Sequence, residues 1–181
     1  DLHARLPHAD EAAQIKVQEP RLGRRGTRAF RTLHAWATPE AFAIDHGVQE
    51  LPLTGRDPAG QLFTGRLHIP HPFASLCMKI AAARDHEHRP EPQPRHRKHA
   101  HDVYLLTAML DATEFSQVQA HAHHFAAAPA MPALRHAVTD LFATPDSPAC
   151  RTLRDQLRGQ PGEPTPVDLT RFCAALRELF A

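Results

Sequence analysis

The chain has 181 residues, 42% of them hydrophobic, so it is long enough to bury one sizeable core. Its 21 Lys and Arg against 20 Asp and Glu give a formal charge of +1, which excludes attraction to nucleic acid or anionic membranes through overall charge. Three widely spaced Cys exclude a disulfide-rich scaffold, and no apolar run approaches the roughly 20 residues that a membrane span needs. We therefore expect a globular, cytoplasmic protein without a membrane partner.

The first part of the chain is predicted to form strands. Alternating or apolar stretches bounded by turn residues indicate strands at residues 1–6, 29–37, 41–48 and 62–69. A helix is predicted at 8–18, and residues 53–61 are rich in the Gly, Asp and Pro that favour a turn.

From Pro72 onward the pattern is helical. Phe73, Leu76, Cys77 and Ile80 recur at i, i+3, i+4 and i+7, and Pro72 suits the first turn of a helix. The three prolines of residues 89–97 predict an exposed loop. Further helices are predicted from about residue 98 to 110 and at 114–127, 132–143, 149–158 and 166–180.

Strands followed by helices predict an α+β fold. We expect a small mixed β-sheet in an α/β core at residues 1–97, followed by a helical C-terminal subdomain at residues 98–181.

Three charged residues stand in unusual positions. Asp45 lies in an apolar strand candidate, where it is either exposed or a ligand for a hard cation such as magnesium. Lys79 lies in the most apolar predicted helix, where it either extends its ammonium group to water or serves a site. Asp102 lies in the first turn of the next helix, where a negative charge is favourable in itself, and it is spaced i, i+4 from Lys98.

The 15 histidines raise the question of a metal site. His101 and Asp102 form a His-Asp pair. With His86 or His88 upstream and Asp111 or Asp140 downstream, they offer the ligand types of an HD-type phosphohydrolase. His121, His123 and His124 are expected on a solvated helix face.

Three segments carry a family resemblance. Lys79 and Ala82 fit a Glu-Lys-x-x-Ala helix core, and Arg95, Lys98 and Asp102 fit an Arg-x-Lys-Asp-x-x-Asp helix opening. Upstream, the stretch AFAIDHGVQELP is similar to a strand with a hydrophobic-x-Asp-x-Gly segment. In their order along the chain, over roughly residues 27 to 110, the three segments resemble the nucleotidyltransferase-like proteins of the AbiEii type, known as toxins of toxin-antitoxin pairs.

The resemblance implies a sheet of nucleotidyltransferase type and transfer of a nucleotide from an NTP to an RNA or protein acceptor, with magnesium as cofactor and an antitoxin protein as partner. Lys79 would be the catalytic cation facing the phosphates, and Asp102, also catalytic, would be the acidic partner that orients Lys79 or the nucleotide. Asp1 and Asp45 would hold the metal, with Asp45 also counted as catalytic. Arg84 and Lys98 would join Lys79 in binding the nucleotide.

The chain departs from the family pattern at three places. Met78 stands where the family has Glu, and His99 stands where it has Asp. The family's N-terminal Gly-Ser turn and Arg-x-Thr-x-Asp-x-Asp motif have no match, so we expect further sequence upstream of Asp1. Two alternatives stay open: a degenerate, non-catalytic member that acts as a binding module, and the HD-type metal-dependent phosphohydrolase.

Overall fold

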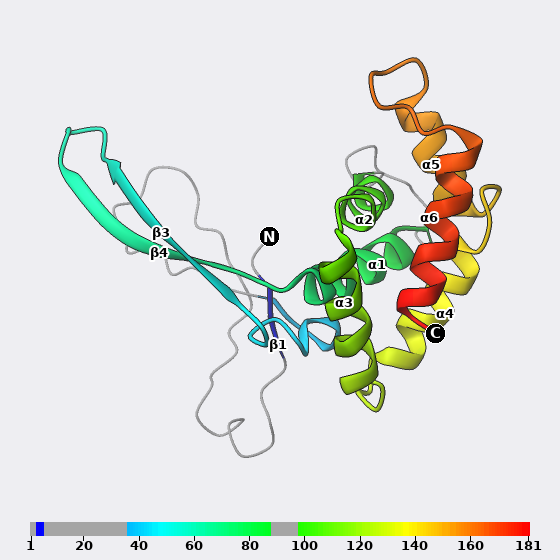
Figure 1. The fold of residues 1–181 in the computed structure, drawn as a ribbon, viewed down its shortest axis with the longest axis horizontal. Helices are drawn as coiled ribbons and strands as arrows, with labels where there is room; N and C mark the ends of the chain where they lie inside the picture. The colour runs from blue at the N-terminus through cyan, green and yellow to red at the C-terminus, as the bar shows by residue number, and fades with distance from the viewer. Residues whose placement is uncertain (1–2, 6–35, 88–97) are drawn as a thin grey trace.

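The structure is a computed structural model that describes residues 3–5, 36–87 and 98–181. Short strands come first and helices follow: β1 His3–Arg5, β2 Trp36–Thr38, a 3-10 turn η1 Pro39–Ala41, β3 Gln49–Arg56, β4 Leu62–Ile69, α1 Pro72–Glu87, α2 Lys98–Ala108, α3 Ala112–His124, α4 Met131–Phe142, α5 Pro148–Leu157 and α6 Pro166–Leu179. The predicted α+β class is confirmed. The helices form one body, from which the β3–β4 hairpin projects (Figure 1).

The strands form two separate two-stranded sheets. β1 and β2 are parallel, with His3 opposite Trp36, whereas β3 and β4 are antiparallel, with Gln49 opposite Ile69. The hairpin turns at residues 57–60, where Asp57 Oδ1 accepts a hydrogen bond from the backbone N–H of Gln61. Its register places five apolar side chains on one face, all of them exposed: Leu51, Leu53, Phe63, Leu67 and Ile69.

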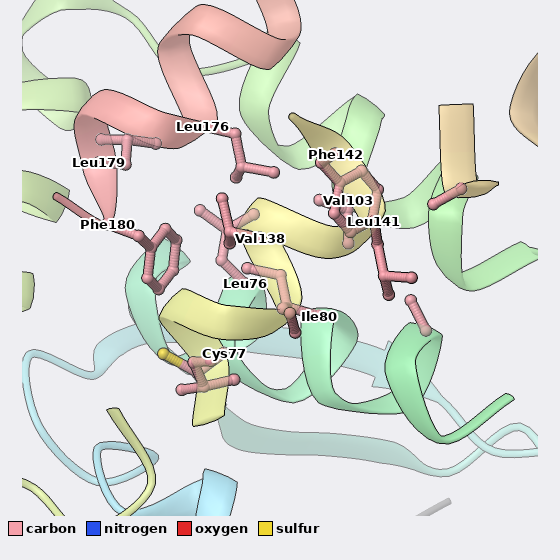
Figure 2. Close-up of a cluster of buried hydrophobic side chains, with 14 of the residues drawn as sticks. Leu76, Cys77, Ile80, Val103, Val138, Leu141, Phe142, Leu176, Leu179 and Phe180 are labelled. Carbon is pink, nitrogen blue, oxygen red and sulfur yellow. The ribbon is translucent and has the colours of Figure 1, made fainter. Parts of the chain in front are cut away.

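The core is built around α1. The four apolar residues of its predicted stripe, Phe73, Leu76, Cys77 and Ile80, are fully buried. In Figure 2 the α1 side chains meet Val138 and Leu141 of α4 and Leu176 and Leu179 of α6. One buried cluster takes residues from α1 and from every later helix, so side chains from both sides of the predicted boundary at 97/98 share it.

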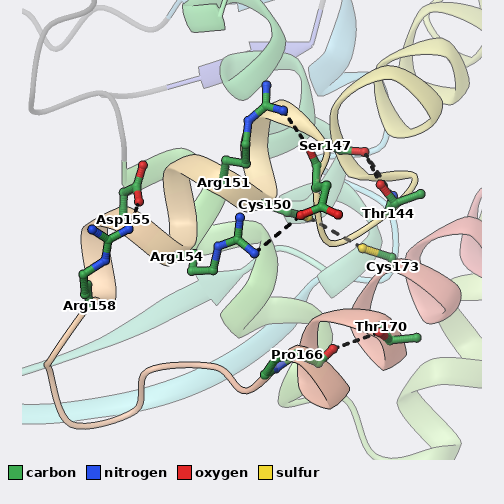
Figure 3. A network of polar contacts seen from close by, with 11 residues as sticks. Thr144, Ser147, Cys150, Arg151, Arg154, Asp155, Arg158, Pro166, Thr170 and Cys173 are labelled. Carbon is green, nitrogen blue, oxygen red and sulfur yellow. Dashed lines mark hydrogen bonds and ion pairs between the residues drawn. The ribbon is translucent and has the colours of Figure 1, made fainter.

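Ion pairs lie along α5, and two thiols lie between α5 and α6 (Figure 3). Arg154 pairs with Asp146 just before α5, and Arg158 pairs with Asp155. The thiols of Cys150 on α5 and Cys173 on α6 lie 3.6 Å apart, and both residues are buried.

The predicted helices are confirmed to within two or three residues at their ends. The strand predicted at 62–69 is β4 as expected, and β1 lies within the one predicted at 1–6. The helix predicted at 8–18 lies outside the described residues, as does most of the strand predicted at 29–37, of which β2 contains the end.

The strand predicted at 41–48 is wrong. This segment continues from η1 as a series of tight turns, in which Ile44 N–H bonds to the carbonyl of Ala41 and His46 N–H to that of Ala43. These local bonds replace the pairing that a strand would need. β3 was not predicted, because its last four residues, 53–56, lie in the stretch 53–61 whose composition predicted a turn.

No helix in the described part of the chain is long and apolar enough to cross a membrane.

Candidate functional site

The structure brings Lys79 and Asp102 together. Lys79 Nζ donates to Asp102 Oδ2 at 2.6 Å, which joins the middle of α1 to the first turns of α2. The two side chains are 35% and 30% exposed, so the pair is half-buried and can be reached from solvent. Charge-assisted hydrogen bonds of this length are among the stronger polar contacts in proteins.

Both helices carry small buried residues near this contact. Ala81 and Ala83 of α1 and Ala100 of α2 are buried. Helices that meet through alanines approach closely, because helix separation depends on the side chains at the contact. We infer that this close approach lets the short side chain of Asp102 reach the end of Lys79.

Arg84 lies on the same helix but belongs to a different charge cluster. Its guanidinium group lies 3.4 Å from Glu40 Oε1 and 2.9 Å from Asp85 Oδ1. Glu40 comes from η1 and is only 16% exposed. The positive charge of Arg84 is thus matched by two carboxylates and holds η1 against α1, which weakens its predicted role in nucleotide binding.

The remaining predicted residues lie elsewhere. Asp45 is exposed in the turn after η1, and its neighbour His46 stacks on His124 of α3 at a ring distance of 5.3 Å. Lys98 is exposed as the first residue of α2. Asp1 lies outside the described residues.

Magnesium was predicted to bind at Asp1 and Asp45. Within residues 3–5, 36–87 and 98–181, no three or more His, Cys, Asp or Glu side chains come together in a group that could hold a metal ion. The predicted pair of ligands stays a prediction, because Asp1 lies outside the described residues. The HD-type alternative stays a prediction, since the side chain of His86 is outside the described set while His101 is half-buried on α2.

A histidine cluster lies where the β3–β4 hairpin joins the helices, and it was not predicted from the sequence. His71, between β4 and α1, is 7% exposed, and its ring stacks on that of His121 with centroids 3.9 Å apart. The expectation that His121 only faces solvent is therefore wrong, whereas His123 and His124 are exposed. Burial, and then the neighbouring His121, hold the pKa of His71 below its ordinary value of 6.5. The sequence gives no sign of this contact, because His71 lies between Pro70 and Pro72, a pattern that predicts only a loop.

A second feature without a sequence signal is a small pocket between α2 and α6. Its volume is about 210 Å³, and Tyr104, Thr107, Arg171 and Phe172 are among its lining residues. Burial, and then the charge of Asp168, raise the pKa of Tyr104. The pocket is smaller than the roughly 300–1,000 Å³ typical of sites for small organic ligands.

Comparison with known proteins adds no assignment to this geometry. No protein-family model, curated protein or solved structure was found to match the chain.

Proposed function

We propose that this protein is nucleotidyltransferase-like and binds a nucleoside triphosphate with the ammonium group of Lys79 against the phosphates. The observation that carries the proposal is the Lys79–Asp102 contact at 2.6 Å. These two residues lie 23 positions apart and come from two separate motifs of the resemblance, so their meeting at one half-buried point supports a shared role.

The chemistry of the pair suits an anion. An ammonium group has three N–H donors, and one of them is used by Asp102. With its side chain 35% exposed, Lys79 has room to direct another donor to a phosphate oxygen while Asp102 fixes its position. A cation held in place stabilises charge that develops on phosphoryl oxygens during transfer without having to reorganise.

Asp102 also explains how the lysine is tolerated beside the apolar core. Ile80 and Ala81 next to Lys79 are buried, and an unpaired ammonium group at such a boundary would lose hydration without compensation. We assign Asp102 as the residue that positions Lys79, not as a group that contacts the nucleotide.

Magnesium would supply charge to the attacking and leaving oxygens of the transfer. The role we propose for the described residues is contact with the phosphates, and a magnesium site at Asp1 and Asp45 rests on the resemblance. The acceptor, RNA or protein, the toxin role with an antitoxin partner and a cytoplasmic location belong to the same proposal and rest on the resemblance.

Calorimetry with each of the four NTPs tests the proposal. We expect Lys79→Met, which keeps the apolar stem and the helix propensity, to weaken binding about tenfold or more, as for loss of one charge-assisted contact. Asp102→Asn should weaken it less, because the cation remains. Arg158→Met removes a positive charge at the end of α5 and serves as the matched control.

Two results would overturn the proposal: no NTP binds to the wild-type chain, or Lys79→Met and Arg158→Met bind NTP equally well. Label from an α-phosphate-labelled NTP that appears on RNA or protein with the wild-type chain would establish transfer. Binding without transfer would instead favour the non-catalytic alternative.

A further inference from the structure

The β3–β4 hairpin is attached to the helical body through its two roots. Apart from Gly55, every residue from 49 to 69 is exposed, and the hairpin projects away from the helices (Figure 1). Its orientation therefore depends on the chain just before β3 and just after β4. Both of these roots meet the same residue, His121 of α3.

The geometry at the roots is tight. Gly47 enters the hairpin with φ +67°, and a Cβ atom placed on it would lie 3.2 Å from His121 Nε2 and 3.4 Å from His71 Cδ2. His71 leaves the hairpin and stacks on His121 with an angle of 19° between the rings. The entering and leaving strands are thus held against α3 through two imidazoles in face-to-face contact.

The hydrogen bonds define the neutral forms of both rings. His71 Nδ1 accepts the backbone N–H of Phe73 at 3.2 Å, so the proton of the neutral ring is on Nε2. His121 Nδ1 donates to the carbonyl of Gln117 at 2.8 Å, so its Nε2 is free of a proton and faces Gly47. Protonation of His71 would place a second proton against the Phe73 N–H, and protonation of His121 would place one in the tight space at Gly47.

We propose that His71 and His121 form a pH-sensitive latch, in which the stacked neutral rings fix the root of the hairpin to α3 and protonation of both rings releases it. Two imidazolium ions stacked at 3.9 Å repel each other, and His71 loses its hydrogen bond from Phe73.

The charged groups around His71 act in both directions, and together with burial they lower its pKa. The ring of His46 in the preceding turn lies 5.2 Å from that of His121, and His124 of α3 stacks on His46. These histidines add positive charge on acidification. Glu114 of α3 acts in the other direction on His71, as does a hydrogen bond with Gln117, while α1 contributes the uncharged ring of Phe73.

The latch can be tested by the distance between two spin labels on the full chain, one at Ala59→Cys in the hairpin turn and one at Ala174→Cys on α6. Both positions are exposed, whereas the three native cysteines are buried and should not take the label. We expect a narrow distance distribution at pH 8 and a clearly broader one at pH 5. His121→Phe, which keeps an aromatic ring but cannot titrate, should stay narrow at both values.

His123→Phe on the exposed side of α3 is the control, and it should broaden at pH 5 as the wild type does. An equally narrow distribution of the wild type at both pH values, or equal broadening of His121→Phe and the wild type, would overturn the proposal. If His121→Phe does not fold, NMR titration of the wild-type imidazoles decides. Broadening at the pH where the His71 and His121 signals shift supports the latch, and broadening at another pH refutes it.

Discussion

The strength of the Lys79–Asp102 contact can be predicted from its geometry. Two unit charges at about 4 Å attract by about 4 kcal/mol at the effective dielectric constant near a protein surface, and loss of hydration and side-chain entropy offsets most of this. Because the side chains are 35% and 30% exposed, the coupling should lie between that of an exposed ion pair, at most ~1 kcal/mol, and that of a buried hydrogen bond to a charged group. We expect about 1–2 kcal/mol.

A double-mutant cycle measures this coupling directly. Lys79→Ala, Asp102→Ala and the double variant are unfolded in urea at pH 7, and the coupling is the non-additive part of the free energies of unfolding. The matched control is the Arg66–Glu50 pair on the hairpin, which is nearly as short, at 2.8 Å, but 73% and 47% exposed. Its coupling should be below about 0.5 kcal/mol.

The comparison of the two cycles decides whether the half-buried pair holds α1 to α2. A coupling for Lys79–Asp102 no larger than that for Arg66–Glu50 would refute the reasoning from burial. The urea m-values of the wild type and the three variants of each cycle should agree, since a changed m-value would mean a changed unfolded or native state and would make the cycle invalid.

Three further predictions follow from the core and its buried groups. Ile80→Ala should lower the free energy of unfolding by about 2–5 kcal/mol, because Ile80 is fully buried; a loss below 1 kcal/mol by urea unfolding would contradict this packing. The thiols of Cys77, Cys150 and Cys173 should react with Ellman's reagent only on unfolding, because all three are buried; burial raises the pKa of Cys77, and the hydrogen bond with Cys173, then burial, raises that of Cys150. Rapid reaction of any thiol in the native protein would refute it. Because the pKa of His71 is lower in the folded than in the unfolded chain, the unfolded chain takes up its proton first, so the His71 contribution to stability is complete above pH 6.5 and falls as pH drops below it. His71→Asn should therefore flatten the loss of stability between pH 7 and 5, and an unchanged slope would contradict the assignment.

The helical part of the fold could be predicted because each helix carries its own local pattern. The i, i+3, i+4, i+7 spacing from Phe73 to Ile80 marks the face that α1 buries. Thr165 and Asp168 form a capping box at the start of α6, and Pro166 lies in its first turn. These signals act over a few residues, so the sequence is sufficient to locate them.

The β part could not be predicted as well, because its order depends on pairing between distant residues. The apolar stretch around Phe42 is typical of a strand, yet Ala41 and Ala43 are buried through tight turns against the helices. Conversely, β3 contains Pro52 and Gly55, which disfavour a strand, and it forms through pairing with β4.

The candidate site was predictable only in part. The contact between Lys79 and Asp102 was expected from two motifs considered together, whereas neither residue alone had a distinctive pattern. The stacking of His71 on His121 had no sequence signal, because it depends on where the hairpin returns to the helical body.

The most direct test of the central claim compares the affinity of one nucleoside triphosphate with that of its nucleoside, for the wild-type chain and for Lys79→Met. If Lys79 contacts the phosphates, the substitution should remove most of the preference for the triphosphate and leave the affinity for the nucleoside unchanged. A preference for the triphosphate that is as strong in Lys79→Met as in the wild type would contradict the account.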